Sequence, residues 1–99
     1  MDKNEAIKLA QAYKALVANY LPVTSMYLFG SYAKGTQTTN SDIDIAVVVE
    51  KSSDDYFTDI PLLWKLRRQI STLIEPVLFD KSDVNSPLYK QVIKYGIAI

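Results

Sequence analysis

The stretch LFGSYAKGTQTTNSDIDIAVVVE, residues 28–50, decides how the chain folds and where its chemistry lies. It places Asp42 and Asp44 inside a segment that otherwise has the apolar character of a buried β-strand. Strands disfavour aspartate, and a carboxylate removed from water is costly unless its charge is compensated. The pair therefore needs either solvent or a positively charged ligand.

Side chains alternate along a strand, so Asp42 and Asp44 emerge on one face while Ile43, Ile45 and Val47 enter the core on the other. Two residues apart on a strand, the aspartate Cα atoms are roughly 7 Å from each other, and their side chains can converge on one ion. A divalent cation between them turns their repulsion into attraction. The alternative is that both carboxylates face solvent and protect a sheet edge from aggregation.

A third acidic residue lies on the next predicted strand, which spans residues 73–79. Glu75 is near the start of this strand. If the strand pairs beside the one that carries the aspartates, Glu75 can face the same ion. Asp80 is the rival, but strand alternation points it to the opposite side from Glu75. We therefore prefer Glu75, although a register slip of one residue would exchange the two.

The turn upstream of the aspartates has the composition of a phosphate site. Gly30 lets the backbone approach a ligand closely. Ser31 offers a hydroxyl and a backbone N–H at the start of a helical turn, and Gly35 lets the chain leave that turn tightly. Lys34 can reach a phosphate oxygen, but a solvated surface lysine is an equally good interpretation.

The hydrophobic pattern predicts the order helix, strand, strand, helix, strand, helix. The predicted helices cover residues 3–19, 59–73 and 86–96, with one helical turn at 31–35. The predicted strands cover residues 25–30, 42–49 and 73–79, and 97–99 is a short strand or a tail. Because a short loop joins the first two strands, they are expected to be antiparallel neighbours. The fold class is α+β, with a mixed sheet of three to four strands flanked by helices.

Local signals define the ends of these elements. Pro61 is expected in the first turn of a helix that starts at Asp59, and Ser86 caps the last helix. The charged stretch 50–59 is expected to be a loop, and Arg67 and Arg68 are expected on a solvated helix face.

The composition excludes several classes of protein. The 99 residues suit a single domain, 1–99, and 48% of them are hydrophobic. Eleven basic and eleven acidic residues cancel, which argues against general nucleic-acid binding. There is no cysteine and no histidine, so carboxylates remain as ligands for a hard cation such as Mg²⁺. Without a signal peptide or a membrane-spanning run, we expect a soluble, cytoplasmic protein.

The segment LFGSYAKGTQTTNSDIDIAVVV resembles the signature of the polymerase β nucleotidyltransferase superfamily, in which Gly-Ser is followed by Asp-x-Asp on the next strand. RRQISTLIEPVLF is similar to the strand that carries the family's third acid, and SPLYKQVIKYGIAI is similar to its C-terminal helix. The short chain resembles the minimal nucleotidyltransferases, which are often encoded beside a HEPN-domain partner. The resemblance implies a nucleotidyltransferase-like fold over nearly the whole chain.

The resemblance also implies a role for each matching position. Gly30 and Ser31 would hold the triphosphate of ATP or another nucleoside triphosphate, and Lys34 and Ser41 would also bind the nucleotide. Lys34 stands where relatives frequently have arginine, which keeps the charge but loses the bidentate contact.

The same resemblance makes Asp42, Asp44 and Glu75 the catalytic acids and the ligands of Mg²⁺, with two ions expected. Glu75 would act as general base on the acceptor hydroxyl, although the third acid of the family is more often aspartate. The implied reaction transfers AMP from ATP to a hydroxyl, and a HEPN toxin is the implied acceptor, which would make the chain an antitoxin.

Two alternatives remain open at this point. The domain is either an active enzyme or a catalytically degenerate binding module that neutralises its partner by contact, as the Glu75 and Lys34 differences suggest. A third hypothesis is that the chain is a structural domain that binds no ligand. The sequence also leaves open a homo-oligomer, the acceptor and the base preference.

Overall fold

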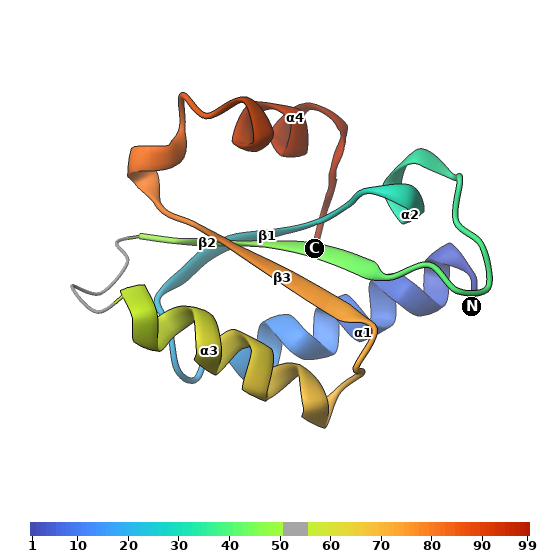
Figure 1. Ribbon diagram of the computed structural model, residues 1–99, viewed down its shortest axis with the longest axis horizontal. Helices are drawn as coiled ribbons and strands as arrows, with labels where there is room; N and C mark the ends of the chain where they lie inside the picture. Colours follow the sequence, from blue (N-terminus) through green and yellow to red (C-terminus); the bar gives the residue numbers. More distant parts are fainter. Residues whose placement is uncertain (51–55) are drawn as a thin grey trace.

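The computed structural model describes residues 1–50 and 56–99, which form a four-stranded sheet with helices on both faces (Figure 1). The strand order is β3-β2-β1-β4, with β2 and β3 parallel and the other neighbouring pairs antiparallel. The α+β prediction is thus confirmed, and so is the antiparallel pairing of the first two strands. The strands are β1 (Val23–Phe29), β2 (Ile43–Val49), β3 (Ile74–Phe79) and β4 (Ile97–Ala98).

The helices follow the order that the periodicity predicts. They are α1 (Lys3–Val17), α2 (Ser31–Lys34), α3 (Tyr56–Leu66) and α4 (Pro87–Tyr95), with 3₁₀ turns η1 (Arg67–Gln69) and η2 (Lys81–Asp83). Side chains cap the first and last helices: Asp2 accepts from the backbone N–H of Glu5, and Ser86 accepts from that of Tyr89. These bonds satisfy N–H groups that have no partner within the helix.

The third helix differs most from the expectation. It begins at Tyr56 rather than Asp59, so Pro61 lies inside the helix and residues 56–59 are not a loop. The rest of the predicted loop, 51–55, lies outside the described residues. The helix also ends at Leu66 instead of continuing to residue 73. The Ser71 hydroxyl accepts from the backbone N–H of Leu73, a local bond that competes with helix continuation.

The two faces of the sheet carry separate apolar clusters. Helices α1 and α3 cover one face and α4 covers part of the other (Figure 1). The α1/α3 face holds the larger cluster, which includes alternate residues of β2: Ile43, Ile45, Val47 and Val49. The α4 face holds a smaller cluster around Ala46, Val48, Phe79 and Val92.

This alternation decides where the acids point. Asp44 shares the side of Ala46 and Val48 on β2, so it lies on the α4 face of the sheet. Burial of the intervening isoleucines and valines against α1 and α3 therefore directs the carboxylate away from the main core.

Within the described residues, none of the helices has the length and apolar character needed to cross a lipid bilayer.

Candidate active site

The site is built around the sharp turn where β1 passes into α2. Gly30 adopts φ 71° and ψ −145°, a conformation that essentially only glycine enters. The single helical turn that follows is closed by Gly35, whose φ is 74° and whose N–H donates to the carbonyl of Ser31. The predicted Gly-Ser turn, with its short helix and glycine exit, is confirmed.

The Asp44 carboxylate lies directly against Gly30. Residue Phe29, which precedes Gly30, is the antiparallel register partner of Asp44. A Cβ atom on Gly30 would lie 2.2 Å from Asp44 Oδ2 and 3.0 Å from its Cγ. Real Cβ atoms essentially never approach another heavy atom that closely. Glycine is therefore required here twice, once for the backbone angle and once for the space that the carboxylate fills.

Glu75 lies next to Asp44 across the parallel strands. The two residues are register partners of β2 and β3, so their side chains leave the same face of the sheet. Asp80 caps the start of η2 instead: its side chain accepts from the backbone N–H of Ser82, and its own N–H donates to the Asp83 carboxylate. Glu75 therefore lies on the face that strand alternation predicted, while its role as a third acid stays a prediction.

The electrostatics of the cluster follow from this crowding. Burial and the nearby charge of Asp42 raise the pKa of Asp44, while a side-chain hydrogen bond with Glu75 opposes the rise. Burial and the charges of Asp42 and Asp44 raise the pKa of Glu75, with a hydrogen bond to Asp42 acting in the same direction. Asp44 and Glu75 therefore hold their protons more tightly than isolated carboxyls do.

Asp42 and Ser41 lie at the edge of this arrangement. Strand β2 begins at Ile43, so the prediction that Asp42 lies within the strand is wrong by one residue, and the side chain is exposed. The Ser41 hydroxyl accepts from the backbone N–H of Thr38 at 2.8 Å and so tightens the preceding loop. Nothing in this contact involves Gly30, and a nucleotide-binding role for Ser41 stays a prediction.

Arg67 is the residue that sequence reasoning missed. Instead of facing solvent, its Nη1 donates to the carbonyl oxygens of Thr72 at 2.6 Å and Ile74 at 3.1 Å. Its guanidinium carbon lies 4.5 Å from the ring centroid of Trp64. Its charge also lowers the pKa of Glu75, against the larger upward effects. The i, i+3 spacing of Trp64 and Arg67 was the signal available in the sequence.

Arg67 therefore fixes the chain where it enters β3, one residue before Glu75. Arg68, by contrast, is exposed, as predicted.

The donor chemistry of the three acids fits a hard divalent cation, since all their ligand atoms are carboxylate oxygens. The described residues nevertheless contain no group of three or more acids, histidines or cysteines spaced to hold a metal ion. A cation binding here would have to draw the carboxylates around itself, and its positive charge would offset their mutual repulsion.

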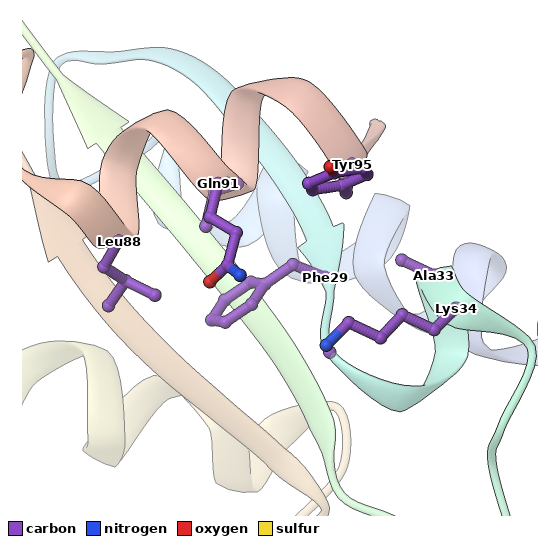
Figure 2. A pocket seen from close by; sticks show the side chains of 8 residues that line it. Phe29, Ala33, Lys34, Leu88, Gln91 and Tyr95 are labelled. Carbon is purple, nitrogen blue, oxygen red and sulfur yellow. The ribbon is translucent and has the colours of Figure 1, made fainter.

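A cavity of about 170 Å³ adjoins the turn on the α4 side of the sheet. Gly30 and Lys34 line it from the turn, and residues of α4 line it from the other side (Figure 2). Figure 2 also shows that the Lys34 side chain reaches from α2 back toward the end of β1. The structure thus brings Gly30, Lys34, Asp44 and Glu75 to one region of one face.

The chain is similar to known proteins in sequence and in fold. The family model described as polymerase beta, nucleotidyltransferase, matches residues 11–99. The protein adenylyltransferase MntA of Shewanella oneidensis is 33% identical over 98 residues, covering 97% of this chain. The alignment spans 63% of that relative's own length.

Two solved structures are similar over nearly the whole chain. A nucleotidyltransferase-like protein from Sulfolobus solfataricus superposes with a TM-score of 0.70 at 25% identity, covering 97% of this chain and 80% of that one. A tri-AMPylated HEPN toxin of Shewanella oneidensis in complex with its MNT antitoxin contains a chain with a TM-score of 0.55 at 29% identity, covering 97% of this chain and 66% of that one. The matched family is a nucleotidyltransferase family, and the Shewanella relative is a protein adenylyltransferase.

Proposed function

Because this chain belongs to the polymerase β-type nucleotidyltransferase family, we propose that it transfers AMP from ATP to a hydroxyl group of a protein partner. The observation that carries the proposal is the register pairing of Asp44 and Glu75 directly beside Gly30. The carboxylate pair supplies oxygen ligands for a metal ion, and it lies directly beside the turn that would hold the triphosphate.

In this proposal the turn binds the triphosphate. The sharp turn at Gly30 places Ser31 at the start of α2, and the Ser31 hydroxyl and N–H donate to phosphate oxygens. Lys34, with its side chain at the rim of the adjoining cavity, contributes a positive charge to the same phosphates. Ser41 would bind the nucleotide only if the loop from Thr38 to Ser41 closes over the phosphates.

The three acids provide the rest of the chemistry. Asp42, Asp44 and Glu75 would hold Mg²⁺, with two ions in the family arrangement, which offset the phosphate charge and align the attacking and leaving oxygens. The acceptor oxygen attacks the α-phosphorus, its proton passes to Glu75 as general base, and the bond to pyrophosphate breaks. The raised pKa of Glu75 makes it a better proton acceptor than an ordinary carboxylate.

The acceptor in this proposal is a HEPN-type toxin, and the chain is its antitoxin. The support is similarity to the MNT chain of a complex with a tri-AMPylated HEPN toxin. Modification of such a toxin would take place in the cytoplasm, where ATP is available. We further propose that residues 1–99 form a single catalytic domain.

The test is transfer of labelled AMP from ATP to a purified HEPN-domain protein, with and without Mg²⁺. Asp42→Asn/Asp44→Asn should abolish labelling, whereas the matched control Glu5→Gln, on the exposed surface of α1, should label like the wild type. Labelling that persists in the double variant would exclude the assignment.

The binding-module alternative predicts a different result in the same experiment. The wild type and Asp42→Asn/Asp44→Asn would then neutralise the toxin equally well without ATP, and no label would be transferred. Neutralisation that requires both ATP and intact aspartates supports the enzyme.

A further inference from the structure

The open edge of the sheet lies beside the candidate acids. Strand β3 carries Glu75 and stands at the end of the strand order, and within the part of the chain that the structure describes no further strand pairs with it. Gly30 and Lys34, the residues proposed to bind phosphate, lie on the other side of Asp44, where β1 passes into α2. An acceptor hydroxyl that gives its proton to Glu75 therefore approaches across the edge of β3 and not through the turn.

The first part of this edge is closed to another strand. The register with β2 turns the N–H and carbonyl positions of alternate β3 residues, Ile74 and Pro76 among them, toward the open side. The Ile74 N–H donates to the Ser71 carbonyl at 3.2 Å, and the Ile74 carbonyl accepts from Arg67 Nη1 at 3.1 Å. Pro76 has no N–H to donate. A partner at this end of β3 must therefore bind through side chains rather than by strand addition.

Exposed apolar side chains adjoin the same end of β3. Trp64 of α3 and Leu73, which immediately precedes β3, are each 38% exposed. Arg67 connects them: its guanidinium carbon lies 4.5 Å from the Trp64 ring centroid, and its Nη1 binds the carbonyls of both chain neighbours of Leu73. In Figure 1 a short turn joins the last part of α3 to the start of β3. Trp64, Arg67 and Leu73 therefore form one surface, which we call the β3-edge surface.

The charge around the β3-edge surface has a single sign. Residues 60–74 contain three basic side chains, Lys65, Arg67 and Arg68, and no acidic one, although the chain as a whole is neutral. Lys65 and Arg68 are exposed, and Arg68 follows Trp64 at i+4, so its charge lies on the same side of the segment. The surface thus has an apolar centre and a basic rim, which is the organisation of a protein interface. Its electrostatic complement is an acidic protein surface.

We propose that the protein acceptor docks on the β3-edge surface through an acidic segment that also carries an apolar side chain. The inference rests on the proposed function and adds to it the surface that brings the acceptor hydroxyl to Glu75. Trp64 is the anchor, since tryptophan is among the residues that dominate the binding energy of protein interfaces. Lys65 and Arg68 select an acidic partner and increase its rate of association.

The first experiment measures AMP transfer from ATP to a purified HEPN-domain protein over a range of acceptor concentrations. Lys65→Glu/Arg68→Glu should raise the KM for the acceptor about tenfold and leave kcat and the calorimetric affinity for ATP unchanged, because neither side chain is proposed to contact ATP. The matched control is Lys8→Glu/Lys90→Glu, which makes the same change in net charge at exposed positions of α1 and α4 and should keep the wild-type KM. Added salt should raise the KM of the wild type but not that of Lys65→Glu/Arg68→Glu.

The second experiment follows the anchor directly. Trp64 is the only tryptophan of the chain, so quenching of its fluorescence by acrylamide reports its exposure, with the Trp64→Phe complex subtracted as background. Addition of the acceptor should remove most of the quenching, because the ring becomes buried in the interface.

The outcomes separate this inference from the function on which it rests. If the wild type transfers AMP while the KM of Lys65→Glu/Arg68→Glu stays at the wild-type value, the docking surface is wrong and the function is untouched. A loss confined to kcat, or a Trp64 ring that acrylamide quenches equally well in the complex, also overturns the inference. A wild type that transfers no AMP overturns both. Retained affinity for ATP demonstrates that the variant is folded.

Discussion

Replacement of Gly30 by alanine tests the geometry on which the candidate site depends. The added Cβ would lie 2.2 Å from Asp44 Oδ2, so the carboxylate must retreat by about 0.8 Å to reach even the 3.0 Å lower limit of real contacts. The backbone at Gly30 also has to keep φ 71° and ψ −145° with a side chain present. Both effects act on the turn and on Asp44 together.

The expected magnitude comes from a comparison of two glycines. Gly35 has a similar φ of 74°, but its added Cβ would meet nothing within 4 Å. Gly35→Ala therefore costs only the left-handed backbone penalty, about 1–2 kcal/mol. Gly30→Ala costs backbone strain of about 1–3 kcal/mol plus about 1–3 kcal/mol for the forced displacement of Asp44. We expect about two to three times the loss of stability at Gly30.

The assays are thermal unfolding and AMP transfer. Each kcal/mol lowers Tm by about 4–8 °C in a domain of this size, so Gly30→Ala should melt well below Gly35→Ala. Because a displacement near 1 Å costs about 100-fold in rate, Gly30→Ala should lose transfer by that factor at a temperature where both variants are folded. Gly35→Ala should retain most of the activity.

A double variant tests whether the clash between the added Cβ at position 30 and Asp44 causes the loss of stability. In Gly30→Ala/Asp44→Ala the oxygen that meets the new Cβ is gone, so part of the lost stability should return. Equal Tm values and equal rates for the two glycine variants would refute the reasoning, and so would a double variant that shows no recovery.

Three further predictions concern charge and packing. Because burial raises the pKa of Asp44 above its ordinary 3.8, the unfolded chain releases this proton first, and the metal-free protein should lose stability as the pH rises from that value. Asp44→Asn should flatten this decline and raise Tm in melts with a chelator as the pH rises above about 4. A wild-type slope in the variant would contradict this expectation. Arg67→Gln should lower the stability by about 1–3 kcal/mol, because two hydrogen bonds to backbone carbonyls are lost. Because the guanidinium lowers the pKa of Glu75, the variant should also move the pH profile of AMP transfer to higher pH. An unchanged pH profile would mean that Arg67 has only a structural role. Tyr13→Phe removes a buried hydroxyl that donates to the Leu63 carbonyl at 2.8 Å, so it should lower Tm by about 4–8 °C per kcal/mol lost. AMP transfer by the folded variant should stay at the wild-type rate. An unchanged Tm would mean that this hydrogen bond contributes little to stability.

The sequence predicted the sheet because its strongest local patterns agree with the tertiary packing. The apolar alternation of β2 fixed which side chains enter the α1/α3 core, and hence the face on which Asp44 lies. The Gly30 and Gly35 positions gave the turn, since both adopt positive φ values that other residues avoid. The pairing of Glu75 with Asp44 followed from strand alternation once β3 was placed beside β2.

The features that the sequence does not predict depend on contacts between residues that are distant in the chain. Arg67 was assigned to solvent because a charged residue on a helix usually lies there, but the chain turns back after α3 and presents the carbonyls of Thr72 and Ile74 to it. The α3 start was placed late because Pro61 suggests a first turn. The cavity between α2 and α4 has no sequence signature, since its walls are separated by more than fifty residues.

The register of β2 therefore determines both which residues enter the core and where Asp44 points. Moving β2 by one residue in its register would bury Asp44 under α1 and α3 and expose Ile43 or Ile45 on the α4 face. An unpaired carboxylate in that core would cost several kcal/mol, so the apolar residues between the acids enforce the orientation of the acids. Small Ala46 then lets α4 approach the same face through Val92 without covering Asp44. The division of this face into a covered half and an acidic half therefore follows from residue size and alternation within β2.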